Sequence, residues 1–417
     1  MLSLDHPLHF DIEKAAFKRD PWSTFAQMRA AGPVIPLKMA FVGRTWVTTT
    51  HASTQALVKD NALFVQEGRH AGKPNVVAGF RWWMPRSLMA VANSMLQKDE
   101  PDHRRLRQLV DKAFARRDVL AMRGNIDRIA DDLLDRFEGR GEVDLVGEFS
   151  RRLPLEVISD LLGLPHEDRA GFADVARRAL NFTNAAGIVM ALGTLGKMIG
   201  YVRDQIERSR HDPRPGLIAE LVRAEEQGDV LDASELLSTV VLLLIAGFET
   251  TTHLISDSVL ALEQHPEQKA WLLADPEARM ERAVEELARF NSPVQSTKPR
   301  YVAQDTEFFG ARLKRGELIM ALVAAANADP AEFDAPDVLR LDRFPNPHLV
   351  FSSGIHFCLG QQLARVETQS ALTRLYARFP ELQLAAPDRI DWIERLGIRG
   401  VKALPLRLNA AAGRLAA

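Results

Sequence analysis

The hydrophobic pattern predicts a mainly helical chain whose longest element runs from about residue 233 to residue 265. Asp232 and Glu235 form the capping-box arrangement that begins a helix, and Pro266 ends it. At about 1.5 Å per residue, such a helix spans roughly 45–50 Å, long enough to cross a whole protein. Its middle is so apolar that we expect it to be buried in the core.

Shorter patterned segments lie on both sides of this helix in the sequence. Helical spacing of apolar residues marks residues 21–31, 54–60, 99–115, 119–137, 155–162, 168–181 and 361–379. Residues 34–37 and 45–50 predict short strands, and residues 305–310 form another β-like run. Residues 182–201 are apolar but contain four glycines, which predicts short or mobile helices, and residues 64–93 predict mostly loop.

Composition limits the classes of protein to consider. The chain has 417 residues, of which 46% are hydrophobic and 26% charged. Length alone does not choose between two domains and one domain over residues 1–417, and no linker divides the chain. A net charge of -2 makes a nucleic-acid binder or an anionic-membrane binder a poor fit. The first residues do not resemble a secretory signal, and the most apolar window, residues 240–247, is shorter than a membrane span of roughly 20 residues. These features predict a cytoplasmic protein.

The single cysteine, Cys358, lies just before the predicted helix at residues 361–379. The unpaired N–H groups and the dipole of a helix N-terminus favour a thiolate, and the nearby Gly360 allows close approach of the backbone. A lone cysteine is more commonly an inert buried residue. A zinc site would need further ligands, since His356 alone is a poor complement, and a cysteine nucleophile would need a base from elsewhere.

A polar cluster interrupts the long helix, where Gly247 and Glu249 precede Thr250 and two further threonines. Burying such groups is costly without partners. Glu249 could face solvent while the threonines bond to carbonyls one turn earlier. Alternatively, the cluster could open the helix locally and admit water.

Two further charged pairs lie at helical spacing. His103 and Arg107 share a helix face, which alone indicates a solvated basic helix. Glu286 and Arg289 can meet at i and i+3, which alone indicates a minor surface pair.

Taken together, these patterns resemble the cytochrome P-450 superfamily, specifically its soluble bacterial members. The pattern Phe-x-x-Gly-x-His-x-Cys-x-Gly at residues 351–360 resembles the haem-binding loop, and Ala-Gly-x-Glu-Thr-Thr at residues 246–251 resembles the oxygen-activation signature. The pair at residues 286–289 matches the family's Glu-x-x-Arg motif, and the motifs occur in family order. The resemblance implies a mainly α, triangular single domain with small β-sheets.

The resemblance also implies roles for individual residues. Cys358 would be the axial ligand of haem b iron, and Glu249 and Thr250 would deliver protons to bound dioxygen. The expected haem contacts are His103, Arg107, Arg300 and His356 at the propionates, together with Phe351, Gly360 and Ala246. Glu286 and Arg289, joined by Arg343, would support the cysteine loop.

The substrate pocket implied by the resemblance is largely apolar. Its expected residues are Trp82, Trp83, Leu242, Ile245, Ala246, Gln295, Ser296 and Ile398. The two tryptophans could equally be packing residues. Lys298 could meet a propionate or solvent, which we favour over recognition of an acidic substrate. The pocket predicts a small to medium hydrophobic substrate.

The implied reaction is hydroxylation of a C–H bond by one oxygen atom of O2. No Gly-x-Gly-x-x-Gly motif is present, so electrons from NAD(P)H should come through a separate ferredoxin and ferredoxin reductase. The ferredoxin would dock near Arg104, Arg105, Lys112 and Arg116. Alternatives are a peroxide-driven peroxygenase, whose family members usually lose the acid and threonine, and a non-enzymatic haem-thiolate sensor, which would not need them.

Overall fold

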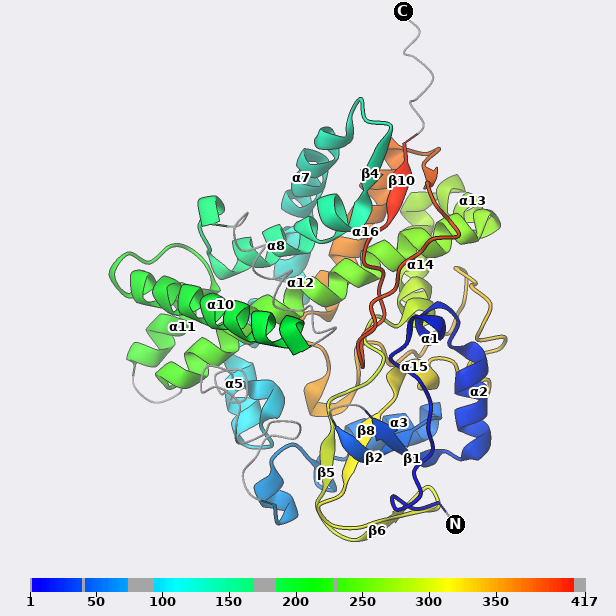
Figure 1. The fold of residues 1–417 in the computed structure, drawn as a ribbon. Helices are drawn as coiled ribbons and strands as arrows, with labels where there is room; N and C mark the ends of the chain where they lie inside the picture. The colour runs from blue at the N-terminus through cyan, green and yellow to red at the C-terminus, as the bar shows by residue number, and fades with distance from the viewer. Residues whose placement is uncertain (1, 40–41, 74–93, 169–184, 228–230, 409–417) are drawn as a thin grey trace, which may run out of the picture.

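The structure is a computed structural model that describes residues 2–39, 42–73, 94–168, 185–227 and 231–408. Helices form one large body, and a sheet with the N-terminal helices lies to one side of it (Figure 1). The predicted helix at residues 168–181, and Trp82 and Trp83, lie outside the described residues.

The longest predicted helix is confirmed as α12 (Ala233–Gln264), which crosses the middle of the helical body (Figure 1). The Asp232 carboxylate accepts hydrogen bonds from the backbone N–H groups of Ser234 and Glu235, both at 2.8 Å, and the Glu235 side chain accepts the Asp232 N–H at 3.1 Å. Among the described residues, α12 alone is long and apolar enough to cross a membrane, but half of its most apolar stretch is buried inside the protein. That burial is typical of a core helix.

Four helices pack around α12 and bury it. They are α8 (Arg152–Leu162), α10 (Ala185–His211), α14 (Pro276–Asn291) and α16 (Gln361–Arg378). The crossing with α8 is close, since a Cβ added at Gly247 would lie 2.9 Å from Cγ1 of Ile158. Gly247 is therefore needed for helix packing, whatever else the motif around it does.

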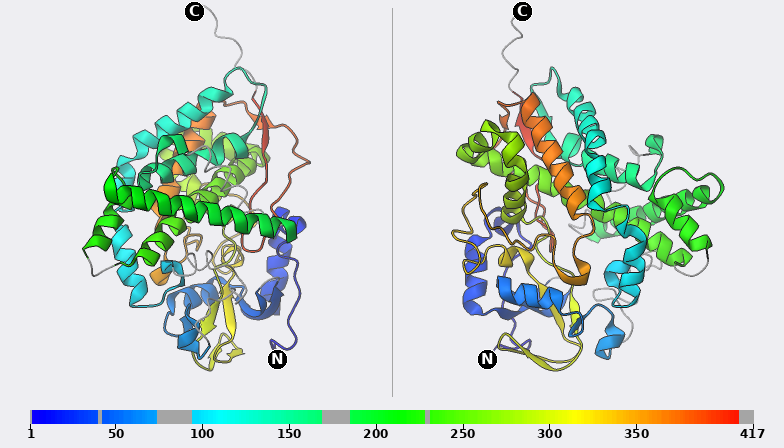
Figure 2. Two further views of the ribbon diagram at one scale, coloured as in Figure 1. Left: turned by 60° about the vertical axis from the view of Figure 1, so that its left-hand side comes forward. Right: turned by 180° about the vertical axis from the view of Figure 1, so that it is seen from behind.

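Of the nine other helices among the described residues, five follow predicted segments with shifted ends and four had no predicted counterpart. The nine helices are α1 (Ala15–Arg19), α2 (Trp22–Ala31), α3 (His51–Lys59), α5 (Asp102–Asp111), α6 (Arg116–Ala121), α7 (Arg123–Leu134), α11 (Leu217–Glu226), α13 (Pro266–Ala274) and α15 (Val323–Ala326). The segment expected as one helix at residues 119–137 is divided between α6, α7 and a 3₁₀ turn, Asp135–Phe137. Seen from behind, α16 runs beside α7 (Figure 2).

The prediction of short helices at residues 182–201 was wrong, because α10 is one continuous helix of 27 residues. Each glycine in a helix costs only about 1 kcal/mol relative to alanine. Four apolar side chains of α10, Met198, Ile199, Val202 and Ile206, are buried against the core. This packing outweighs the glycine cost, and a pattern of propensities alone does not show it.

The largest sheet has five strands in the order β1-β2-β8-β5-β3. These strands are β1 (Val34–Met39), β2 (Gly43–Thr48), β8 (Leu318–Ala321), β5 (Arg300–Val302) and β3 (Phe64–Val65). β2 and β8 are parallel with Trp46 opposite Ile319, while β5 is antiparallel to β8 with Arg300 opposite the same Ile319. The sheet therefore fixes the backbone position from which the Arg300 side chain extends.

Two smaller sheets complete the fold. One contains β4 (Glu142–Asp144), β10 (Pro405–Arg407) and β9 (Gln383–Leu384), and the other pairs β6 (Thr306–Phe308) with β7 (Ala311–Leu313). The prediction of a mainly α chain with small β-sheets is confirmed.

Candidate active site

Cys358 lies between a 3₁₀ turn, Gly354–His356, and the first residue of α16. Its N–H donates to the Phe351 carbonyl at 2.9 Å, which closes the loop. Gly354 has φ +71°, and a Cβ there would lie 2.6 Å from the Val58 carbonyl oxygen, so only glycine lets the loop rest on α3.

The Cys358 thiol is free, and it has exposed surface although protein atoms surround it densely. Both properties are expected of a residue that borders an internal space. Burial raises the pKa of Cys358, while the Gly360 N–H and the cations of Arg107 and Arg365 act in the opposite direction. Burial of the thiol thus outweighs the helix terminus that we expected to favour the thiolate.

A group of basic side chains lies beside the cysteine loop, and two of them, His103 and Arg300, are buried. The rings of His103 and His356 are 4.4 Å apart between centroids. Burial, followed by the charges of Arg300, His103 and Arg107, lowers the pKa of His356 to about 2, and burial lowers the pKa of Arg300 to about 10. Burial, followed by Arg107, also lowers the pKa of His103. The fold therefore gathers the four residues that the sequence assigned to the haem propionates.

Three nitrogen atoms of this group are buried without hydrogen-bond partners: Nδ1 of His103, Nδ1 of His356 and Nε of Arg300. Unpartnered buried donors are rare and costly. Carboxylates placed among them would accept these donors and offset the gathered positive charge. The residues present therefore fit a cofactor with two carboxylates. The Arg107 guanidinium donates to the carbonyls of Ile355 and Phe357, at 3.0 and 2.6 Å, and so also braces the loop.

One face of α12, here called the open face, keeps side chains with accessible surface. These are Leu242, Ile245, Ala246, Glu249 and Thr250, each three or four residues from another member of the set. Their neighbours on the other faces of α12, including Leu244 and Phe248, are buried. This open face carries the apolar residues predicted for the pocket and the two predicted proton carriers.

The three threonines of the signature bond to the helix backbone. Thr250 donates to the Ala246 carbonyl at 3.0 Å, Thr251 to Gly247 at 3.4 Å and Thr252 to Phe248 at 2.8 Å. The helix is unbroken through these residues, so the possible local opening is not present. The expected bonds to carbonyls one turn earlier are confirmed. Glu249 does not face solvent, because it forms an ion pair with Arg395.

Two of the remaining pocket residues lie together. The chain at Val294 pairs with Ile398, and Ser296 Oγ lies 3.1 Å from where a Cβ on Gly397 would be. Gln295 points elsewhere: its carboxamide oxygen accepts a hydrogen bond from the buried Lys18. This placement argues against the predicted contact between Gln295 and substrate.

Comparison with known proteins agrees with this geometry. The family model described as Cytochrome P-450 matches residues 279–391. The polyketide biosynthesis cytochrome P-450 PksS of Bacillus subtilis (strain 168) is 36% identical over 406 residues, covering 96% of this chain and 99% of that protein. The chain belongs to the cytochrome P-450 family. It is therefore a haem-thiolate monooxygenase that binds haem b.

Other relatives span the same length. Vitamin D(3) 25-hydroxylase of Pseudonocardia autotrophica is 36% identical, with 96% of each chain covered. 6-Deoxyerythronolide B hydroxylase of Saccharopolyspora erythraea is 33% identical, with 96% of this chain and 98% of that protein covered. The solved structure of a myxobacterial cytochrome P-450, CYP267B1, in complex with myristic acid has a TM-score of 0.87 at 35% identity and covers 96% of this chain and 99% of that chain.

Two layers of ion pairs, centred on Glu286 and Glu285 of α14, lie beside the cysteine loop of this cytochrome P-450. In the deeper layer, Glu286 accepts from Arg289 Nε and Nη2, both at 2.8 Å, and from Arg343 Nε at 3.1 Å. The side chains of Glu286 and Arg289 are 0% exposed. The predicted ion-pair network with Arg343 is therefore present, and it is buried, not a minor surface pair.

The second layer was missed from the sequence. Glu285 accepts from Arg365 Nη2 at 2.8 Å and from His348 Nε2 at 3.0 Å. Phe351 lies between these two partners, with the Arg365 guanidinium 4.2 Å from its ring centre and the His348 ring 5.9 Å away. Arg365 lies in the segment directly after the cysteine motif, and this position was the feature of the sequence that could have identified it. No feature of the sequence identifies Arg395, because its partner Glu249 is distant in sequence.

The basic residues predicted for ferredoxin docking differ in their availability. Arg104, Lys112 and Arg116 are exposed, although Arg104 pairs with Glu100 at 3.1 Å. Arg105 is bound to Glu235 at 2.6 Å and 3.0 Å, so it braces the start of α12.

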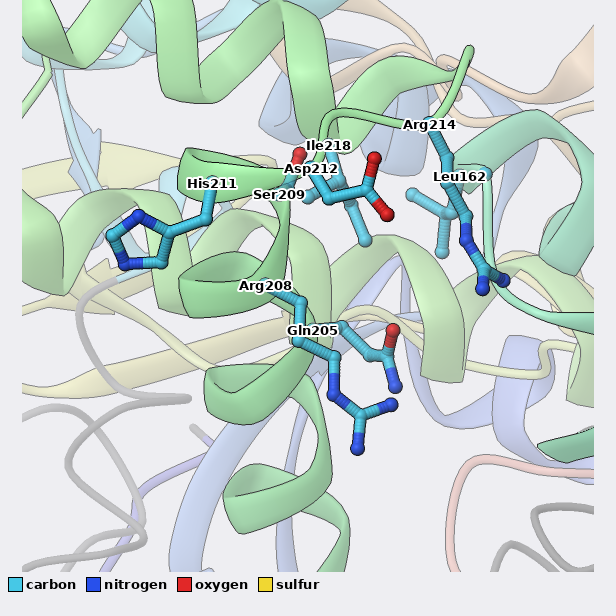
Figure 3. Close-up of a pocket in the computed structure, with 9 residues that line it drawn as sticks. Leu162, Gln205, Arg208, Ser209, His211, Asp212, Arg214 and Ile218 are labelled. Carbon is cyan, nitrogen blue, oxygen red and sulfur yellow. The ribbon is translucent and has the colours of Figure 1, made fainter.

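A separate pocket of about 230 Å³ lies where α10 ends and α11 begins (Figure 3). Polar residues such as Gln205, Arg208 and Asp212 line it. It shares no residue with the predicted active site.

Proposed function

We propose that this cytochrome P-450 hydroxylates a C–H bond of a small to medium hydrophobic substrate, using electrons from NAD(P)H through a ferredoxin and its reductase. The observation that carries this proposal is the open face of α12. It presents Leu242, Ile245 and Ala246 beside Glu249 and Thr250, so an apolar surface and two proton carriers share one face of the helix.

The cofactor would be held from two sides. Cys358 would supply its thiolate to the iron, and His103, Arg300, His356 and Arg107 would hold the two carboxylates. When bound, thiolate-ligated haem supplies the activation of dioxygen that inserts one oxygen atom into a C–H bond. In balance, substrate, O2, two electrons and two protons become the alcohol and one water.

The two protons would pass through residues of α12. The Thr250 hydroxyl now donates to the Ala246 carbonyl, and rotation about its χ1 would direct the hydrogen toward the open face. Glu249, the preceding residue, would resupply that proton. Thr252 bonds to the backbone from the buried side of the helix, so it would not take part.

The substrate is proposed to be apolar because Leu242 and Ile245 lie on the open face of α12, and the family resemblance expects Ile398 in the same pocket. The names of relatives support this class. They include a vitamin D(3) hydroxylase, and solved structures contain myristic acid or testosterone. We propose that the substrate is a terpenoid, aromatic or steroid-like compound, and that the protein works in the cytoplasm.

The electron donor is proposed to be an acidic ferredoxin. Arg104, Lys112 and Arg116 would meet it through complementary charge, and this attraction should weaken as salt increases. Since Arg105 is already bound to Glu235, it would contribute less to docking than the other three.

The first experiment is the spectrum of the reduced protein with and without carbon monoxide, followed by turnover. A strongly red-shifted Soret band is expected in the parent, and Cys358→Ser should abolish it. Myristic acid and testosterone would then be tested for a spin-state shift. An unshifted band in the parent would refute thiolate ligation.

Turnover then tests the proton carriers with a matched pair of variants. Thr250→Ala should lower the product formed per NADH several-fold and release hydrogen peroxide, while Thr252→Ala should resemble the parent. Equal coupling in Thr250→Ala and the parent would refute the role of Thr250. Product formation with peroxide but not with O2 would indicate a peroxygenase, and no turnover of any kind would indicate a sensor.

A further inference from the structure

Residues 392–401, here called the C-terminal hairpin, form a closed loop against the active site. The base is closed by pairing of Trp392 with Val401 and by the Ile393 N–H, which donates to the Gly400 carbonyl at 2.9 Å. The tip is fixed to the segment at residues 293–295. Two backbone hydrogen bonds hold it there, from Gln295 N–H to the Gly397 carbonyl at 2.8 Å and from Arg399 N–H to the Pro293 carbonyl at 2.9 Å.

The C-terminal hairpin also contacts three successive turns of α12. A Cβ on Gly400 would lie 2.2 Å from Nδ1 of His253, so the hairpin backbone rests directly on that ring. One turn further, the Asp257 carboxyl group accepts the N–H of Val401. One turn earlier, Arg395 binds Glu249. The hairpin is thus held in a fixed position along this side of α12.

The ion pair between Arg395 and Glu249 is shielded from solvent. The side chains are 19% and 15% exposed, respectively. Shielding makes such a pair stronger than one at the surface, where solvent and salt weaken it. Because the arginine comes from the hairpin, the Glu249 carboxylate is held toward the hairpin, while the Thr250 hydroxyl bonds within the helix. Neither proposed proton carrier bonds to the other.

We propose that Arg395 is a positioning residue for Glu249. It holds the Glu249 carboxylate at the C-terminal hairpin, and this is the position from which a proton passes to Thr250. This inference rests on the proposed function, in which Glu249 supplies protons. Ile398, expected at the substrate, lies three residues further along the same hairpin. The hairpin therefore joins the wall of the pocket to the residue that supplies protons.

The test uses the haem-loaded protein with Arg395→Gln, which removes the charge, and Arg395→Lys, which retains it. Arg389→Gln is the control, because Arg389 is exposed and lies earlier in the same C-terminal segment. Arg395→Gln should lower product per NADH several-fold while leaving substrate affinity, measured by spin-state titration, within about twofold. Arg395→Lys should recover much of the loss, and Arg389→Gln should match the parent.

The Glu249→Gln background shows whether Arg395 acts through Glu249. There, Arg395→Gln should cause no further loss of coupling, and the decreases in Tm from the two substitutions should be less than additive. Additive decreases in Tm, or an equal loss of coupling in both backgrounds, would overturn the proposal. If Glu249→Gln itself leaves coupling unchanged, the proposed role of Glu249 fails. If only Arg395→Gln leaves it unchanged, the role of Arg395 alone fails.

Discussion

Replacement of Glu286 by glutamine tests how strongly the buried network supports the cysteine loop. Besides the two arginines, Glu286 accepts the Arg340 N–H and the Asn346 side-chain amide, both at 3.1 Å. Every neighbour of this carboxylate is therefore a donor. Glutamine would place its own NH2 group against donors and would leave two buried guanidinium groups without a counter-charge.

The expected cost follows from this arrangement. Breaking a buried ion pair by removing one partner costs about 3–5 kcal/mol, and burial of the network supports this range. Unfolding entropy scales with chain length, so for 417 residues this cost corresponds to a decrease in Tm of roughly 3–6 °C.

Thermal unfolding of the haem-loaded protein, followed by circular dichroism and by the Soret band, would measure this cost. Glu281→Gln is the matched control, since it makes the same change at an exposed position of α14. We also expect Glu286→Gln to release haem at a lower temperature than the control. If both variants unfold within about 1 °C of the parent, the network does not stabilise the loop and the reasoning is refuted.

Three further predictions follow from contacts in the structure. Although burial raises it, hydrogen bonds from Arg365 and His348 lower the pKa of Glu285 to about 2. The stability that Glu285 contributes should therefore be present above about pH 4.5 and lost as the pH falls toward 2, a loss that Glu285→Gln should lack when Tm is measured against pH. Gly400→Ala should lower Tm because its Cβ meets the His253 ring, whereas Gly124→Ala, with open space on α7, should stabilise by about 0.5–1 kcal/mol in urea unfolding. Gly247→Ala should cost about 1–3 kcal/mol in the same assay, and Ile158→Ala should remove most of that difference in a double variant.

Local sequence patterns predicted the structure correctly where a single interaction between nearby residues determines it. The capping box at Asp232 and the proline after His265 mark α12 because both act within one turn of the helix. The spacing of Glu286 and Arg289 predicts their contact for the same reason. The spacing alone does not show how deeply that pair is buried, because burial depends on the loop at residues 334–343, which folds over it from elsewhere in the chain.

Signals that depend on tertiary packing were less informative. The glycines of α10 indicated breaks in the helix, but α10 is continuous because its buried side chains pack against the core. The polar cluster in α12 indicated either an open helix or a solvent-facing acid, and the structure has neither. Its decisive partner, Arg395, lies 146 residues further along the chain. No periodicity within α12 could identify it.

The alternation of side chains along an extended chain bears on the prediction that Gln295 contacts the substrate. Residues 294–298 run between two neighbours like a strand, with Gln295 N–H bonded to Gly397 and Thr297 N–H bonded to Ala321. Successive side chains of such a segment point to opposite sides, so Gln295 and Ser296 could not both face the substrate. The structure follows this alternation. Gln295 meets Lys18, while Ser296 lies beside Gly397.

The same alternation places Lys298 on the side of Ser296 and Arg300. Consistent with this, the charges of both Lys298 and Arg300 contribute to the lowered pKa of His356. Burial lowers the pKa of Lys298 to about 8, so it is mostly cationic at neutral pH, and it has no ion-pair partner within the described ranges. This position agrees with the prediction that Lys298 meets a propionate more readily than an acidic substrate. Period-two spacing back from Arg300, which was predicted to contact a propionate, would have supported this prediction from the sequence alone.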